Sequence, residues 1–323
     1  MPIRNQSDIA AIEAIALSER ALPESSYAAL VDASKRSPDG RALSFFLSAD
    51  RLDEAHVWTY AELVADVTRA ANLFAALGVA ADRPVAYVLP NLPDTHFAIW
   101  GGEAAGAALA VNPMLEPRQV AAILRFARAS ILVTLAPALN PKAWSGLAEQ
   151  LASLPDLSAI AFVDMADYLD GEKRGAVRAS IEEAAARLQL KVANLREAMR
   201  EQPSDRLVPP RTIKADDISS YFCTGGTTGA PKIAVRTYRN EVFDCWAVSK
   251  ATETDGKPET VLCGLPLFHV NGQLVFSRGC AATMSSSPRP RAIGERTSSP
   301  DSGRLYRATA LQCSQAFRPF TPP

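Results

Sequence analysis

The sequence predicts an α/β fold in which helices flank both faces of a parallel sheet. Short apolar runs recur along the chain, and stretches with helical spacing separate them. The hydrophobic content of 48% supplies enough core for most of the 323 residues. Strands that alternate with helices are joined by crossover connections, so they run parallel and are covered on both faces.

The first clear element is a helix over residues 58–77. Apolar residues recur on one face of this stretch at helical spacing. Thr59 precedes Glu62 by three residues, which is the arrangement of a capping box at a helix start. Gly78 follows the last apolar position, where a helix is expected to end.

The elements that follow alternate in type. Helices are predicted over residues 91–106 and 116–129, the second with Pro117 in its first turn. Residues 166–210 are charged, and they predict a surface helix followed by a polar, proline-rich connection. The apolar runs predicted as buried strands are 83–90, 107–112, 130–136, 158–164 and 218–223.

This order divides the chain into three predicted parts. Residues 1–210 form a first α/β subdomain with surface helices. Residues 211–275 begin a second α/β subdomain, whose incomplete sheet layer starts at Ile218 and which carries the segment discussed below. Residues 276–323 form a disordered or out-of-frame tail.

The tail is predicted from an abrupt shift in composition. Residues 276–323 contain seven arginines, eight serines and six prolines but no lysine, and their net charge is +5. A disordered tail is one explanation of this composition. Loss of the coding frame near Phe276 is the other, and we favour it because the shift falls in the middle of an element.

Charge and composition argue against several classes of protein. The formal net charge of -1 gives no sign of nucleic-acid binding. The five cysteines are widely spaced and form no CxxC pair, so a disulfide framework or zinc site is not expected and a reducing cytoplasm is favoured. The sequence contains no run of about 18 uncharged apolar residues, so it predicts no transmembrane segment.

The most informative stretch is "YFCTGGTTGAPKIAVRTYRNEV", residues 221–242. Its glycines can turn backbone N–H groups toward an anion, its threonines add hydroxyl donors, and its lysine adds positive charge. These groups together predict a phosphate-binding loop, with a plain flexible turn as the alternative. The predicted phosphate-binding residues are Thr224, Gly225, Gly226, Thr227, Thr228, Gly229 and Lys232.

Two familiar phosphate loops do not fit the spacing. The Walker pattern needs Gly-Lys-Ser/Thr, whereas Pro231 precedes Lys232 and Ile233 follows it. The dinucleotide pattern GxGxxG is not met either. The segment is therefore neither a conventional P-loop nor a Rossmann fingerprint.

The stretch "TGGTTGAPK" resembles the phosphate-binding signature of the adenylate-forming (AMP-binding) superfamily, which includes acyl-CoA synthetases, peptide-synthetase adenylation domains and luciferases. Gly225 stands where the family most often has serine. Three further stretches resemble family segments in the same order: "WTYAEL", "LPNLPDTHFAIWGGEAAGAALAVNP" and "LPLFHVNG". The resemblance covers residues 57–275, the N-terminal part of such enzymes.

The resemblance implies an ATP-dependent carboxylate–CoA ligase. In this family a carboxylic acid attacks the α-phosphorus of ATP, and the thiol of coenzyme A then displaces AMP from the acyl-adenylate. The residues of the predicted phosphate loop would grip the β- and γ-phosphates, with Mg²⁺ bridging them. His269 ends an apolar run predicted as a strand and matches a family histidine near the acyl pocket, so it is the candidate catalytic residue. A structural histidine is the alternative.

Three other side chains are predicted to be structural. Cys223 has no histidine or acidic partner nearby in sequence, so a small buried residue is expected. His56 and His96 match no site motif of the family, and we expect them to be structural or exposed.

The resemblance also implies parts that this sequence does not show. The family's adenine-binding segment, ribose-binding aspartate and C-terminal catalytic lysine have no match after His269. We therefore expect a truncated product with little ligase activity of its own. The alternatives are a non-catalytic remnant that binds nucleotide or a partner, and a phosphate-transferring enzyme with an atypical loop. Which carboxylic acid is the substrate stays open.

Overall fold

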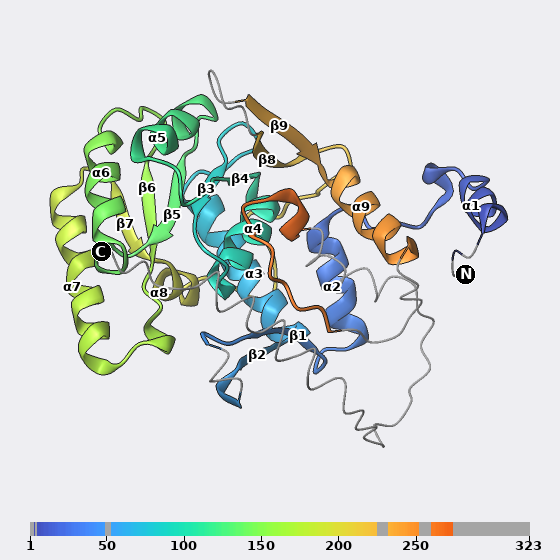
Figure 1. Cartoon of the computed structure of the whole chain (residues 1–323), viewed down its shortest axis with the longest axis horizontal. Coiled ribbons are helices and arrows are strands. Elements are labelled where there is room, and N and C mark those ends of the chain that lie inside the picture. The colour runs from blue at the N-terminus through green and yellow to red at the C-terminus, as the bar shows by residue number, and fades with distance from the viewer. Residues whose placement is uncertain (1–2, 4, 49–52, 225–231, 252–259, 274–323) are drawn as a thin grey trace.

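The structure is a computed structural model that describes residues 3, 5–48, 53–224, 232–251 and 260–273, and the predicted tail lies outside this part. The described chain forms a seven-stranded sheet with helices on both faces and a separate two-stranded sheet (Figure 1). The predicted α/β fold class is thereby confirmed. Among the described helices, none combines the length and the apolarity needed to span a bilayer.

The larger sheet has the strand order β7-β6-β5-β3-β4-β8-β9. Its strands are β3 (Val85–Val88), β4 (Ala108–Ala110), β5 (Ile131–Leu135), β6 (Ala159–Val163), β7 (Lys191–Asn194), β8 (Ile218–Thr224) and β9 (Lys232–Thr237). Neighbouring strands are parallel throughout, except that β9 is antiparallel to β8. The smaller sheet pairs β1 (Arg41–Phe45) with β2 (His56–Thr59) in antiparallel register.

Helices cover both faces of the larger sheet, as the buried strands require. The described helices are α1 (Gln6–Glu13), α2 (Ser26–Arg36), α3 (Tyr60–Ala76), α4 (Pro93–Ala105), α5 (Pro117–Phe126), α6 (Pro141–Leu151), α7 (Gly171–Arg187), α8 (Leu195–Arg200) and α9 (Tyr238–Ala251). Ile131 and Val133 of β5 join the core shared with α2, α3, α4 and α8, whereas Leu132 joins the core shared with α5, α6 and α7. This alternation follows from the period of two along a strand.

The helix α3 begins and ends as its sequence predicts. The Thr59 hydroxyl oxygen accepts a hydrogen bond from the Glu62 N–H at 3.2 Å, and the Glu62 carboxylate accepts one from the Thr59 N–H at 2.8 Å. Gly78 has a φ of 95°, a conformation that favours glycine. The capping box and the helix stop are therefore both confirmed.

Two expectations about sheet strands are wrong. Residues 166–210 contain the strand β7 between α7 and α8, which the sequence did not reveal because β7 is a four-residue edge strand that is only half-buried. The strand starting at Ile218 does not open a separate sheet layer. It pairs in parallel with β4 and extends the same sheet, because β4 offers an edge whose backbone groups need partners. The subdomain boundaries at 210 and 275 stay a prediction.

Candidate functional site

The predicted phosphate-binding segment connects the two strands of a hairpin at the edge of the sheet. β8 ends at Thr224 and β9 begins at Lys232, and the register pairs these two residues directly. The ends of the glycine-rich segment therefore lie side by side. The side chain of Lys232 is exposed, so a ligand can approach it from solvent. The predicted members that lie outside the described residues are Gly225, Gly226, Thr227, Thr228 and Gly229.

His269 lies in a turn of the segment 260–273, which Figure 1 draws in orange-red beside α4. Its N–H donates to the Pro266 carbonyl at 3.0 Å, and its carbonyl accepts from the Gly272 N–H at 2.9 Å. The imidazole is exposed, with its Nδ1 at the long distance of 3.5 Å from the Asn271 N–H. The prediction of a strand before His269 is wrong. The backbone groups of Leu265 and Leu267 form hydrogen bonds with side chains instead of with a neighbouring strand.

Two side chains at the carboxyl end of β3 hold the His269 turn. The Asn91 amide donates to the Leu265 carbonyl and accepts from the Leu267 N–H, both at 2.8 Å. The hydroxyl of the fully buried Tyr87 donates to the Leu267 carbonyl at 3.0 Å. A single asparagine thus supplies the donor and the acceptor that a neighbouring strand would otherwise provide.

A buried polar cluster lies between α4 and the β8–α9 region. The Glu241 carboxylate accepts from the hydroxyls of Ser219 and Ser220 at 2.7 and 2.8 Å, and it lies 3.7 Å from Nη1 of Arg236. The Glu103 carboxyl accepts from the Ser26 hydroxyl at 2.7 Å. Burial raises the pKa of Glu103 well above its usual range, and the nearby charge of Glu241 raises that pKa further.

The cluster brings the two predicted site segments together. Nη1 of Arg236, on β9, donates to the side-chain oxygen of Gln273, which follows the His269 turn, at 3.3 Å. Sequence reasoning missed Arg236, Glu241 and Gln273. The charges of Arg236 and Glu241, close in sequence to the predicted phosphate loop, are a usable signal, whereas Gln273 offers none.

Of the side chains predicted as structural, Cys223 is only half-buried rather than buried as expected, whereas His96 and His56 are buried and exposed, respectively. His96 is buried and stacked on Trp100 with ring centroids 5.6 Å apart, and burial lowers its pKa to about 3, so it is neutral at physiological pH. Burial raises the pKa of Cys223 to about 11, which keeps it a thiol rather than a nucleophilic thiolate. His56 is exposed.

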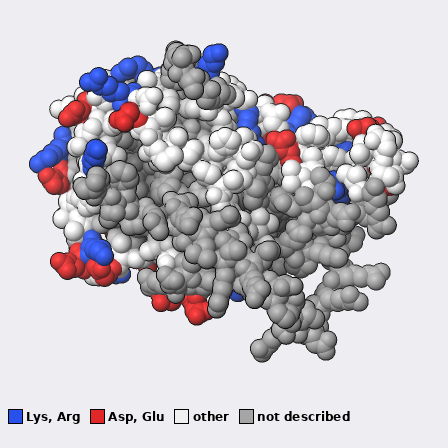
Figure 2. Space-filling view, in the orientation of Figure 1, with Lys and Arg blue, Asp and Glu red and all other residues white. Residues whose placement is uncertain are grey.

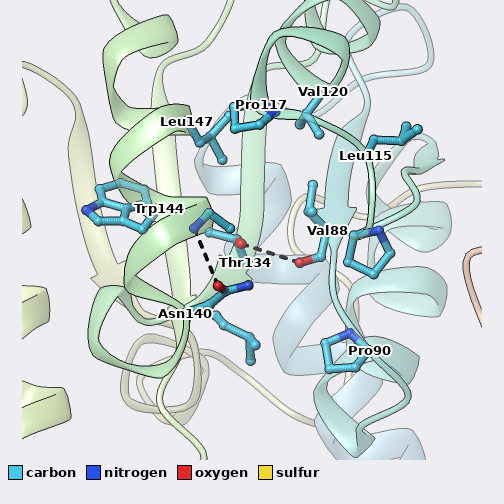
Figure 3. Close-up of a pocket in the computed structure, with 12 residues that line it drawn as sticks. Val88, Pro90, Leu115, Pro117, Val120, Thr134, Asn140, Trp144 and Leu147 are labelled. Carbon is cyan, nitrogen blue, oxygen red and sulfur yellow. Dashed lines mark hydrogen bonds between the residues drawn. The ribbon is translucent and has the colours of Figure 1, made fainter. Parts of the chain in front are cut away.

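A small crevice of about 50 Å³ lies beside the carboxyl ends of β3 and β5 (Figure 3). The chain continues from β3 to β4 on one side and returns to β5 on the other, so this is a topological switch point, where open α/β sheets commonly bind ligands. Trp144 and Leu147 of α6 and Val88 of β3 make its lining mainly apolar. The Thr134 hydroxyl in this lining donates to the Val88 carbonyl at 3.3 Å.

No metal-binding cluster is found in the part of the chain that the structure describes. Specifically, no group of three or more His, Cys, Asp or Glu side chains there is arranged to hold an ion. Two cationic side chains lie on the described strand β9 next to the candidate segment: Lys232 is exposed and Arg236 is largely buried.

Comparison with known proteins gives a consistent result. The sequence model of the family described as "AMP-binding enzyme" matches residues 30–294. The marinolic acid–CoA ligase of Pseudoalteromonas sp. (strain SANK 73390) is 31% identical over 281 residues, which are 85% of this chain and 39% of that protein. The long-chain-fatty-acid–CoA ligase of Bacillus subtilis (strain 168) is 27% identical over 75% of this chain and 42% of its own length.

A solved structure shares the fold. The didomain of a carboxylic acid reductase from Segniliparus rugosus, in complex with AMP, superimposes with a TM-score of 0.60 at 20% identity. The match covers 80% of this chain and 37% of that one. The chain thus spans about two fifths of the length of the relatives it matches, and it corresponds to one part of their fold.

Proposed function

The chain belongs to the AMP-binding enzyme family. From this membership we propose that its function is that of an ATP-dependent carboxylate–CoA ligase, which forms an acyl-adenylate and then a thioester. The observation that carries this proposal is the hairpin. The glycine-rich segment starts and ends on the paired residues Thr224 and Lys232, and a partly buried hydrogen bond ties the same hairpin to the His269 turn. A polyphosphate grip and a candidate acyl-site residue therefore belong to one unit.

The described ends of the segment fit a nucleotide triphosphate. Phosphate oxygens need many donors and positive charge, and Lys232 supplies an exposed ammonium where the segment rejoins the sheet. The hydroxyls and N–H groups from Thr224 to Gly229 are the proposed donors to the β- and γ-phosphates. Mg²⁺, if bound, would shield phosphate charge and retain several waters, since it prefers oxygen ligands.

The chemistry assigned to this chain is mostly positioning and charge stabilisation. A carboxylate and a triphosphate repel one another, so the protein must hold both in line and offset the negative charge that moves to pyrophosphate. Lys232 performs the second task in this proposal. His269, exposed on its turn, would face the carboxylic acid and the incoming thiol of coenzyme A.

The class of carboxylic acid follows only loosely from the relatives. One relative acts on marinolic acid and another on long-chain fatty acids, as their names state. Of these two names, that of the Bacillus subtilis relative states a chain type, so we propose a long-chain aliphatic acid as the substrate class to be tested first.

The test is carboxylate-dependent exchange of pyrophosphate into ATP by the full chain, with identification of the nucleotide product. In line with the low activity expected from the sequence, we expect a slow exchange with AMP and pyrophosphate as products, and a rate that Lys232→Ala lowers further by about 10- to 100-fold, the worth of one charge-assisted hydrogen bond. Lys191→Ala is the matched control, because Lys191 is also exposed and begins a strand at the opposite edge of the same sheet.

Three outcomes would contradict the proposal. ADP and phosphate as products would indicate phosphoryl transfer instead. Magnesium-nucleotide binding without pyrophosphate exchange would favour a non-catalytic nucleotide-binding protein. Equal exchange by the Lys232→Ala and Lys191→Ala variants would remove Lys232 from the site.

A further inference from the structure

The link between the hairpin and the His269 turn passes through the side-chain amide of Gln273. Gln273 is 8% exposed, and it faces Tyr87, which is fully buried. Its nitrogen donates to the Tyr87 hydroxyl oxygen at 2.7 Å and to the Leu267 carbonyl at 3.3 Å. Its oxygen accepts from Arg236 at 3.3 Å. Every polar atom of this amide therefore has a partner, and the pattern works in only one orientation of the amide.

Arg236 has two further partners besides Gln273. Its guanidinium carbon lies 5.1 Å from the centre of the Phe222 ring on β8, which is within the range of a cation–π contact. Its Nη1 also lies 3.7 Å from the Glu241 carboxylate, whose side chain is 8% exposed. The Arg236 side chain is itself only 11% exposed, so its charge is held in the interior by these partners.

From this geometry we propose that Gln273 and Arg236 are positioning residues that lock the His269 turn to the β8–β9 hairpin. The connection runs from Glu241 through Arg236 and Gln273 to Tyr87 and the Leu267 carbonyl. Arg236 lies four residues after Lys232 on the same strand, and Gln273 lies four residues after His269. A shift of the hairpin is thus transmitted to the turn through one partly buried hydrogen bond and the buried hydrogen bonds of the Gln273 nitrogen.

The structural connection does not depend on the proposed function, but its effect on catalysis rests on that function. If the glycine-rich segment binds a triphosphate and His269 faces the acyl group, the connection sets the distance between the two reacting partners. Small errors in such a distance are costly, because catalysis by orientation depends on near-attack geometry. Neither Gln273 nor Arg236 needs to touch a substrate for this role.

The experiment is hydrogen–deuterium exchange of the full chain, with and without Mg–ATP, on the unaltered protein and on Gln273→Leu. Leucine is similar in size to glutamine but has neither the amide donor nor the amide acceptor. The contact between Arg236 and Glu241 is kept in this variant. In the unaltered protein we expect Mg–ATP to slow exchange in residues 232–237 and also in residues 265–273. In Gln273→Leu, the first effect should persist and the second should shrink by about fivefold, which corresponds to the loss of one hydrogen bond.

Exchange without nucleotide separates this proposal from the proposed function. If Mg–ATP changes no peptide of the unaltered protein, nucleotide binding fails. The positioning role still predicts that Gln273→Leu speeds exchange of residues 265–273 about fivefold while β5 and β6 keep their rates. Equal exchange of residues 265–273 in both proteins, or equal acceleration of all peptides, would overturn the positioning role.

Two further variants guard against a folding defect. If Gln273→Leu fails to fold, Arg236→Lys is the second variant. It keeps a positive charge beside Glu241 but removes the guanidinium that bonds Gln273. It should reduce the effect of Mg–ATP on exchange in residues 265–273 in the same way. Gln150→Leu on α6 is the matched control for the loss of a glutamine, because α6 packs against the other face of the sheet. It should leave both segments unchanged.

Discussion

At the scale of single residues, Glu103 shows how a buried charge can limit stability. Only 1% of the residue is exposed, and Glu241 is close enough to oppose its ionisation. The folded state therefore holds a proton on Glu103 that the unfolded chain releases above its ordinary pKa of about 4.3. The bond from the Ser26 hydroxyl only partly offsets this effect.

The pH dependence of stability follows with a definite sign. Because the pKa of Glu103 is raised on folding, its contribution is complete below the unfolded pKa and declines as pH rises toward the folded pKa. The slope approaches about 1.4 kcal/mol per pH unit in that window. Glu103→Gln, which keeps an acceptor for Ser26 but cannot ionise, should remove this slope. Urea unfolding of both proteins at a series of pH values above the ordinary pKa of glutamate measures it.

An exposed glutamate provides the control for this comparison. Glu149 lies on α6 and is exposed, so Glu149→Gln should leave the shape of the pH profile unchanged. A Glu103→Gln profile that runs parallel to that of the unaltered protein would show that Glu103 is ionised in the folded state, against the assignment made here.

At the scale of elements, α4 lies unusually close to its neighbours because of two adjacent glycines. A Cβ on Gly101 would lie 2.5 Å from the Cβ of Ala70 on α3. A Cβ on Gly102 would collide with a methyl group of Val85 on β3 and lie 3.2 Å from the Cβ of Ala108 on β4. The sequence shows the pair of glycines, but only the structure shows that backbone proximity, rather than a turn, requires them.

A pair of glycine substitutions tests this close packing. Gly102→Ala should lower the free energy of unfolding by about 1–3 kcal/mol, because β3 and β4 cannot move apart without disturbing the sheet. Gly175→Ala, in α7, should raise it by about 0.5–1 kcal/mol, because a Cβ there meets nothing within 4 Å and the helix gains from alanine. Urea unfolding of the two variants gives both values. A Gly102→Ala variant as stable as Gly175→Ala would mean that α4 does not sit this close to the sheet.

At the scale of the whole molecule, the sequence predicted the buried elements better than the edges. The strands β3, β5 and β6 were predictable because both faces are covered and their residues are nearly all apolar. The edge strands β7 and β9 are half-exposed and carry no such run. β8 was predicted as a strand, but its place beside β4 depends on pairing between distant segments, which a local pattern does not contain.

The candidate site divides in the same way. The glycine-rich segment was proposed because its residue types carry a chemical meaning by themselves, and His269 was proposed because it matches a family segment. Arg236, Gln273 and Asn91 were missed because their importance comes from partners far away in sequence: Asn91 bonds residues 265 and 267, and Arg236 bonds Gln273. The hydrogen bonds that join the site segments were therefore visible only in three dimensions.

The layered sheet also predicts which parts of the molecule open first. β3 lies between β4 and β5 with both faces covered, whereas β9 pairs with β8 alone among the described strands and exposes Val235 at its centre. Without ligand, amides of β9 should exchange with solvent on the order of 100-fold faster than those of β3, a difference of about 2.7 kcal/mol in opening free energy. Native-state hydrogen exchange resolved by peptide measures both strands in one experiment. If β9 proved as slow as β3, a partner outside the described residues would have to cover its free edge, and the hairpin would be a fixed scaffold rather than an element that a bound ligand stabilises.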